Sequence, residues 1–239
     1  MKQGPEFDFL SIVPHFDFEG DFLEAARYGQ GHINDTFAAR FRLPDGRIRR
    51  YLVQRINTRV FREPERLMEN IQAVTTFLRQ RILAAGGDPQ RGTLTLIPDG
   101  GGRPYYRDPD GGVWRAYVFI EGARTYQLAR SPDQMLQAGR AFGTFQRQLA
   151  DFPAGRLHET IPHFHDTPAR IRALEDAVRR DPAGRAAGVA AEIAFVRERA
   201  AEAGRLQEGL AEGRLPLRVT HNDTKFNNVM IDDATGAAV

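Results

Sequence analysis

Alternating apolar and polar positions in the first 120 residues predict an antiparallel sheet into which one helix is inserted. A short helix or turn is expected from residue 22, ahead of a Gly-rich segment at 28–36. The inserted helix is predicted from Pro64 to Leu83, where apolar residues recur at helical spacing, and Gly86 and Gly87 end it. Strands are predicted at the following segments: Phe37–Leu43, Ile48–Ile56, Thr93–Ile97, Tyr105–Arg107 and Val113–Glu121.

The second half of the chain has mainly helical periodicity. Helices are predicted from Ser131-Pro132, an N-cap with Pro at the first helical position, to about Ala150, and from Thr167 through Arg180. A long helical pattern follows over Gly188–Gly213. Short strands are then expected at these segments: Leu217–Thr220, Val229–Ile231 and from Ala237 onward. The expected class is α+β in two lobes, a β-rich lobe at 1–122 and a mostly helical lobe at 123–239.

Composition narrows the possible functions only a little. The apolar content of 41% is that of a globular protein, and no run approaches the ~18 apolar residues of a membrane span. With no cysteine, disulfides and thiolate metal sites are excluded. Arginines alternate with acidic residues instead of forming one stripe, which argues against nucleic-acid binding. These features favour a cytoplasmic protein with no nucleic-acid or membrane partner, whose oligomeric state the sequence leaves open.

The most informative motif is H-x-D-x-K-x-x-N at His221–Asn228. It has the spacing of kinase catalytic loops, in which an Asp accepts the proton of the attacking hydroxyl and an Asn binds magnesium. Asp223 is therefore the candidate base and Asn228 the candidate metal ligand, with Lys225 facing the transferred phosphoryl group. His221 is expected to support the loop by hydrogen bonding and not to act as a base. The alternative is a polar turn between strands, but four residues match the motif in type and spacing.

The Gly-rich segment is a second candidate site. Gly29, Gly31, His32, Asn34 and Thr36 lie in a turn that opens into a strand, where backbone N–H groups can approach phosphates. The segment lacks a third Gly, and no G-K-[ST] follows, so it is not a Walker A loop. A plain hairpin turn is the competing interpretation.

Two further segments are candidates for nucleotide binding. Arg55 is predicted to hold the α- and β-phosphates from its strand, with Gln54 on the other face. Its possible partners are Glu63, Glu65 and Glu69, of which Glu69 lies well inside the helix. An exposed strand arginine is the alternative for Arg55. Backbone groups of Phe119, Ile120 and Glu121, where a strand meets the lobe boundary, are predicted to bind adenine; a simple core strand would explain them equally.

A cluster of histidines at residues 158–165 raises the question of a metal site. No ligand pattern such as H-E-x-x-H is present, and no cysteine supports zinc. Asp166 or Thr167 is better interpreted as the cap of the helix that follows.

Taken together, these residues resemble the aminoglycoside phosphotransferase and choline kinase superfamily, and most closely its N-acetylhexosamine 1-kinases. The resemblance spans nearly the whole chain and is carried by the following segments: 29–36, 54–57 with 60–61, 67–71, 115–117 with 120–123, 164–168, and 221–225 with 227–228.

The resemblance implies a bilobal protein-kinase-like fold that uses ATP and Mg²⁺. The implied reaction moves the γ-phosphate to the anomeric hydroxyl of an N-acetylhexosamine or related sugar, with Asp223 as base and Asn228 as metal ligand. Two alternatives remain open: a kinase for an aminoglycoside, choline or another small hydroxyl compound, and an inactive or nucleotide-binding-only fragment. The inactive fragment is considered because the family places a second metal-binding Asp on the strand after the Asp232–Gly236 turn. The sequence stops at Val239 before such an Asp occurs, so a C-terminally truncated chain is expected.

Overall fold

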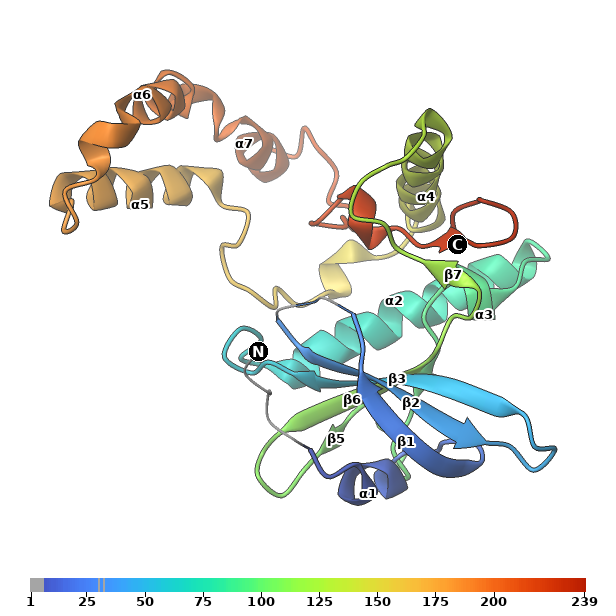
Figure 1. Cartoon of the computed structure of the whole chain (residues 1–239). Coiled ribbons are helices and arrows are strands. Elements are labelled where there is room, and N and C mark those ends of the chain that lie inside the picture. The colour runs from blue at the N-terminus through green and yellow to red at the C-terminus, as the bar shows by residue number, and fades with distance from the viewer. Residues whose placement is uncertain (1–6, 30, 32) are drawn as a thin grey trace. The chain divides into compact units, whose positions relative to one another are not determined.

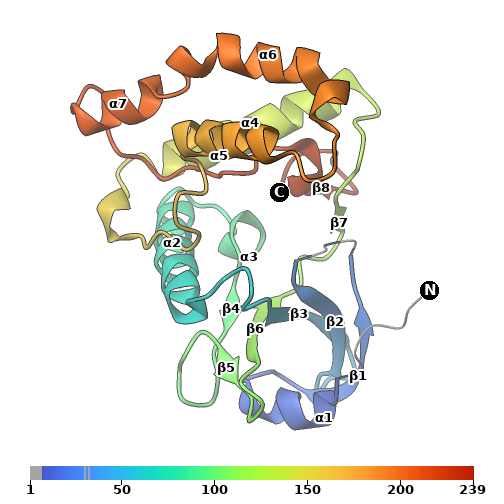
Figure 2. The same ribbon diagram turned by 90° about the vertical axis from the view of Figure 1, so that its left-hand side faces the viewer.

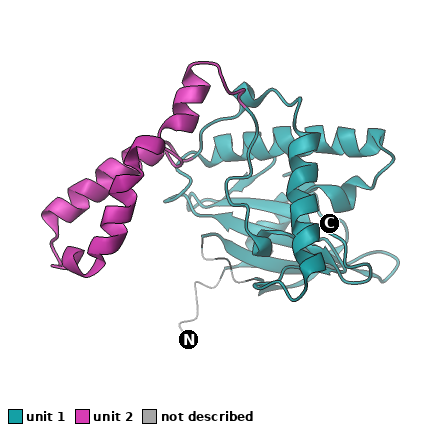
Figure 3. Cartoon of the chain, turned by 90° about the horizontal axis from the view of Figure 1, so that it is seen from above, with its two compact units in different colours: residues 1–160, 218–239 teal, residues 161–217 magenta. Residues whose placement is uncertain are grey.

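The computed structural model describes residues 7–29, 31 and 33–239. The described chain divides into two compact units, one formed by residues up to 160 together with 218–239 and the other by residues 161–217 (Figure 3). The predicted functional division at residue 122 is a different one and stays a prediction. Each unit is described by itself below.

Unit 1 is built on an antiparallel sheet (Figure 1). Its strands run in the order β1-β2-β3-β6-β4, and β5 also pairs with β6. The bounds are β1 Asp21–Arg27, β2 Asp35–Arg42, β3 Ile48–Ile56, β4 Leu96–Ile97, β5 Tyr106–Arg107 and β6 Val113–Val118. The sheet and the hairpin of β2 and β3 confirm the predicted antiparallel N-terminal half.

One face of the sheet carries an aromatic core. Alternate residues of the central strands are buried there, among them Phe37, Tyr51 and Trp114. The short helix α1, Phe9–Ile12, and the 3₁₀ turn Val13–His15 cover this core and lie below the sheet in Figure 1.

The opposite face of the sheet packs against α2, Pro64–Ala84 (Figure 2). Met68 of α2 is fully buried against Ile56 of β3 and Val113 of β6. The helix begins with Pro at its first position and matches its predicted bounds closely. Alternate residues of each strand therefore lie on opposite faces of the sheet, one facing α2 and the other facing the aromatic core.

The remainder of unit 1 connects the sheet to the loop motif. It comprises α3 Pro89–Gly92, β7 Ala123–Arg124, α4 Pro132–Gln148, the 3₁₀ turns Ala154–Arg156 and Phe226–Asn228, and β8 Ile231–Asp232. Ser131 caps α4 as predicted, its hydroxyl accepting from the Gln134 N–H. β7 and β8 form a separate two-stranded sheet, so the segment after β6 pairs with the strand after the loop motif.

Unit 2 is helical. It contains α5 Thr167–Arg180, α6 Ala190–Glu198 and α7 Arg205–Ala211, with 3₁₀ turns at Ala186–Val189 and Ala200–Glu202. Asp166 caps α5, accepting from the Ala169 N–H at 2.8 Å, as the sequence predicts. The single long helix expected over Gly188–Gly213 is wrong: the segment forms two shorter helices joined by a 3₁₀ turn.

Other local expectations also need correction. Residues 21–27 form edge strand β1, where a short helix or turn was expected, because pairing with β2 outweighs the helical preference of its Leu, Glu, Ala and Arg residues. Residues 217–220 form no strand. The predicted strand to Glu121 ends at Val118. The mixed class, an N-terminal antiparallel sheet followed by a mostly helical region, is confirmed.

Candidate active site

The loop motif brings its three chemically important side chains into direct contact. The Asn228 side-chain amide donates to Oδ2 and to the backbone carbonyl of Asp223, both at 2.8 Å. The Lys225 ammonium lies 3.0 Å from the same carboxylate oxygen. The 3₁₀ turn Phe226–Asn228 makes this possible, because it folds the chain back within three residues of Lys225.

Asp223 is both accessible and ionised. Its side chain is 61% exposed. Asp223 accepts hydrogen bonds from Lys225, which has the larger effect, and from Asn228. These bonds lower the pKa of Asp223 below its ordinary value, although burial opposes the shift. A carboxylate that is charged and open to solvent can receive a hydroxyl proton. The same lowered pKa makes it a weak base in isolation, so its usefulness depends on positioning.

The side chain of His221 packs the loop against α4. Its ring packs edge-on against Phe142 and Phe145 of α4, with centroids 5.3 and 5.8 Å away. Among the described residues its buried Nδ1 has no hydrogen-bond partner. These contacts favour a supporting role through ring packing, whereas the sequence suggested support through hydrogen bonds.

The Gly-rich segment forms the turn between β1 and β2. Gly29 has φ of 77°, which an L side chain rarely adopts, and the Tyr28 N–H donates to the Thr36 carbonyl at 2.9 Å to close the turn. The Asn34 side chain accepts from the Asn57 N–H at 3.0 Å. Among the described residues, none would lie within 4 Å of a Cβ at Gly31. His32 lies outside the described residues.

Arg55 and Glu69 are not brought together. Arg55 pairs with Trp114 across β6 and therefore lies on the aromatic face, where its guanidinium sits 5.3 Å from the Phe7 ring. A Cβ at Gly112 would be 2.8 Å from Arg55 Nε, so the arginine is packed against that turn. The helix that carries Glu69 covers the other face of the sheet.

Glu69 instead has a partner in the segment after α4. Its carboxylate lies 2.6 Å from Nε2 of His158, and the neighbouring Asn70 exchanges two hydrogen bonds of 2.8 Å with the His158 backbone. These bonds connect residue 158 to the first half of α2.

Sequence reasoning missed a polar cluster on the α2-facing side of the sheet. Gln54 donates to the Thr36 hydroxyl at 2.9 Å and accepts from Arg115 Nε at 3.0 Å. Arg115 also lies 3.9 Å from the Met68 sulfur of α2. No carboxylate pairs with Arg115 among the described residues. A prediction that placed Gln54, and not Arg55, on the helix-facing side of the strand would have found this cluster.

The segment predicted to hold adenine already makes several contacts of its own. The Phe119 N–H donates to the Arg50 carbonyl at 3.2 Å, and the Glu121 carbonyl accepts from Arg91 at 2.8 Å. The Arg50 guanidinium lies 3.9 Å from the centre of the Phe119 ring and also pairs with the Glu121 carboxylate. Ile120 lies between these two residues in the sequence and lines a large cavity.

That cavity has a volume of about 870 Å³ and is mostly apolar. It lies within unit 1, bounded by α2, α3, α4 and the segments 219–221 and 228–230. Ile120 and Asn228 both line it. A residue of the predicted adenine segment and one of the loop motif therefore face the same space.

A sequence model of the phosphotransferase enzyme family matches residues 24–239, which is most of the chain. The chain belongs to the phosphotransferase enzyme family. The match extends from β1 through the Asp223 loop to the last residue.

Three kinases or phosphotransferases are among the solved structures that match this chain. A spectinomycin phosphotransferase in complex with ADP and spectinomycin is 16% identical, with a TM-score of 0.49 over 99% of this chain and 69% of its own. An aminoglycoside phosphotransferase from Alicyclobacillus acidocaldarius is 14% identical, with a TM-score of 0.42 over 75% and 46%. An amicoumacin kinase in complex with AMP-PNP, Ca²⁺ and Ami is 15% identical, with a TM-score of 0.37 over 72% and 52%.

For this phosphotransferase family member, the residues after the loop can be tested as metal ligands. Asp232 accepts from the Ala234 and Thr235 N–H groups at 3.0 and 2.8 Å, and Asp233 is paired with Arg124 at 2.6 Å. Both carboxylates are thus committed to contacts in the turn and with arginines. Within the described residues, no three His, Cys, Asp or Glu side chains gather to hold a metal. None of the described helices combines the length and apolar character needed to cross a bilayer.

Proposed function

We propose that this family member transfers the γ-phosphate of ATP to a hydroxyl group of a small molecule. The observation that carries the proposal is the contact of Asp223 with both Lys225 and Asn228 in an exposed loop. Phosphoryl transfer requires positioning and charge neutralisation more than covalent chemistry, and these three side chains supply both.

Each side chain has a distinct role in this proposal. Asp223 orients the acceptor hydroxyl and takes its proton. Lys225 neutralises charge on the transferred phosphoryl group, for which a compact ammonium is well suited. Asn228 uses its amide nitrogen to hold Asp223, which leaves its side-chain oxygen available to a cation.

Magnesium fits this arrangement in one respect. It favours oxygen ligands and takes most of its coordination from phosphates and water, so a single Asn228 oxygen is a chemically suitable protein contribution. When bound, the ion would neutralise charge on the phosphate oxygens.

The nucleotide is proposed to lie between the Gly-rich turn and the segment Phe119–Glu121, in a nucleotide-binding lobe of residues 1–122. Gly29, Gly31, His32, Asn34 and Thr36 remain the proposed phosphate-side residues. Arg55 and Glu69, which the sequence also assigned to the nucleotide, lie on opposite sides of the sheet. Arg115 lies on the α2-facing side, where its Nε donates to the Gln54 side chain. We therefore assign to Arg115 the phosphate contact first expected from Arg55.

The acceptor is proposed to be the anomeric hydroxyl of an N-acetylhexosamine or a related sugar. This rests on the sequence resemblance, since none of the contacts described above selects an acceptor. Reaction with cytoplasmic ATP implies a cytoplasmic protein.

The test is a coupled assay of ATP consumption by the purified gene product with Mg²⁺. The acceptors are N-acetylglucosamine, N-acetylgalactosamine, spectinomycin, kanamycin and choline, with 1-O-methyl-N-acetylglucosamine as a matched control. Turnover with the free sugars and none with the methyl glycoside supports the sugar 1-kinase. Turnover with only the antibiotics or choline rejects the sugar and retains the phosphotransferase. No turnover with any of them, together with no binding of ADP, rejects both.

A further inference from the structure

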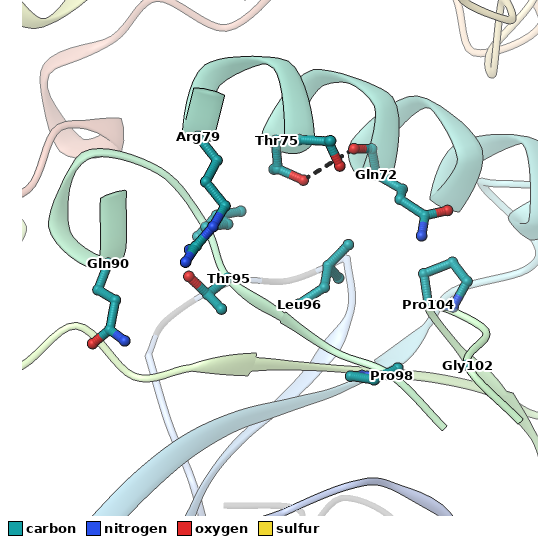
Figure 4. Close-up of a pocket in the computed structure, with 11 residues that line it drawn as sticks. Gln72, Thr75, Arg79, Gln90, Thr95, Leu96, Pro98, Gly102 and Pro104 are labelled. Carbon is teal, nitrogen blue, oxygen red and sulfur yellow. Dashed lines mark hydrogen bonds between the residues drawn. The ribbon is translucent and has the colours of Figure 1, made fainter. Parts of the chain in front are cut away.

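A second cavity lies against α2 (Figure 4). Its volume is about 460 Å³, and it is bounded by α2, by α3 and by the segment 94–104 that contains β4. It shares Thr75 and Leu94 with the larger cavity but includes no residue of the loop motif and none of Phe119–Glu121. It is thus a separate recess with a common wall.

Two polar groups in this recess lack partners. The hydroxyl oxygen of Thr95 is buried and has no hydrogen bond within the described part of the chain. The Arg79 side chain reaches from α2 toward Thr95 in Figure 4 and forms no ion pair with any described residue. A buried hydroxyl without a partner is costly, and a ligand that accepts a hydrogen bond from it would remove that cost.

The positive charge of the recess indicates which class of ligand it could bind. Among the described residues that line it, Arg79 alone is charged and none is acidic. Gln72 and Gln90 add neutral polar groups at opposite ends, as Figure 4 shows. A guanidinium beside a free hydroxyl matches a carboxylate, which accepts from both.

The remaining walls are apolar. Leu96 and Pro98 form the floor below Thr95, so the ligand's body is expected to be apolar while its head is anionic. A cavity of this size holds a single-ring compound with room for water.

We propose that this recess binds a small carboxylate with an aromatic or aliphatic body, with its carboxylate on Arg79 and the Thr95 hydroxyl. The recess is lined by none of the residues proposed above to bind the nucleotide or to form the catalytic loop. A nucleotide is therefore not expected to compete for it.

The experiment measures binding of 4-fluorobenzoate by ligand-observed ¹⁹F NMR on the intact protein. The neutral analogue 4-fluorobenzyl alcohol and the cationic analogue 4-fluorobenzylamine test the charge requirement. The variants are Arg79→Gln and Thr95→Val, with Arg147→Gln on α4 as the matched control, because Arg147 is exposed and lines neither cavity. Circular dichroism and a thermal melt verify that each variant folds.

We expect saturable binding of the benzoate that Arg79→Gln weakens about tenfold or more and Thr95→Val weakens several-fold. Arg147→Gln and saturating ADP should leave it unchanged. Any of three results would overturn the proposal. The benzoate could show no saturable binding, the alcohol and the amine could bind as tightly as the benzoate, or the Arg79→Gln variant could keep wild-type affinity. Folded Thr95→Val protein with unchanged affinity would remove the hydroxyl from the site.

Discussion

The guanidinium of Arg91 lies 2.5 Å from the Asp232 carboxylate, and its other terminal nitrogen donates to the Glu121 carbonyl at 2.8 Å. Arg91 belongs to α3, while Asp232 ends β8, the strand that follows the Asp223 loop. The Arg91 side chain therefore links two segments of unit 1 by hydrogen bonds. One is the segment proposed to bind adenine, and the other is the strand that follows the proposed catalytic loop.

Replacing Arg91 by Met should lower the free energy of unfolding by about 1–2 kcal/mol. The Arg91 side chain is 38% exposed, which screens the ion pair, but Asp232 is mostly buried and would lose a charged partner. Urea unfolding followed by fluorescence of Trp114 measures the change. Arg147→Met, an exposed arginine on α4, is the control and should change stability by less than about 0.5 kcal/mol. Equal effects of both variants would show that the contacts of Arg91 with Asp232 and Glu121 do not stabilise the fold.

Asp99 should make stability depend on acid pH. Burial opposes its ionisation, but hydrogen bonds from Arg103 and from the Gly101 N–H outweigh burial and lower the pKa of Asp99 below its ordinary value. A carboxyl group whose pKa is lowered on folding contributes stability above its unfolded pKa, about 3.9, and loses that contribution as pH falls through its folded pKa.

Urea unfolding of wild type and Asp99→Asn at pH 7, 5 and 3 checks this expectation. The variant keeps the shape and an acceptor oxygen for the Gly101 and Arg103 N–H groups but loses the charge. The stability difference should be similar at pH 7 and 5 and smaller at pH 3. A difference that stays constant down to pH 3 would mean that the charge of Asp99 adds nothing to the fold.

Elements whose signals are local were predicted correctly from the sequence. The apolar spacing and Pro64 located α2, and Ser131 and Asp166 are caps whose hydrogen bonds lie within three residues. β1 was missed because its composition favours a helix and only its pairing with β2, a contact with a later segment, makes it a strand. The long helix over Gly188–Gly213 was overextended across Gly204, which precedes α7.

The candidate site shows the same contrast between near and distant contacts. Asp223, Lys225 and Asn228 meet because their spacing in one short turn is sufficient. The face occupied by Arg55 depends on which side of the sheet α2 covers, and the local pattern of apolar residues does not contain that information. The same is true of Glu69, whose partner His158 is far away along the chain.

The two candidate phosphate-binding arginines can be separated by mutation. Arg115→Met should weaken binding of ADP with Mg²⁺ about tenfold or more, because it removes a partly buried cation on the α2-facing side. Arg55→Met should weaken ADP binding less than about threefold, because its guanidinium lies against Phe7 and Gly112 on the other face. Titration with a fluorescent ADP analogue measures both. The reverse ranking, in folded variants, would restore Arg55 to the role first expected for it.

Asp223→Asn should abolish phosphoryl transfer while leaving the binding of ADP within about threefold of wild type. The amide keeps the size of the side chain and an acceptor for Lys225 and Asn228, yet it can no longer take a proton from the acceptor hydroxyl. Loss of a general base lowers kcat by about 10²–10⁴. Asp110→Asn, an exposed carboxylate on the turn between β5 and β6, is the matched control and should retain full kcat. If kcat of the Asp223 variant fell less than tenfold while the protein remained folded, proton transfer would have to be assigned to another group, and the contact of Asp223 with Lys225 and Asn228 would be a structural feature of the turn.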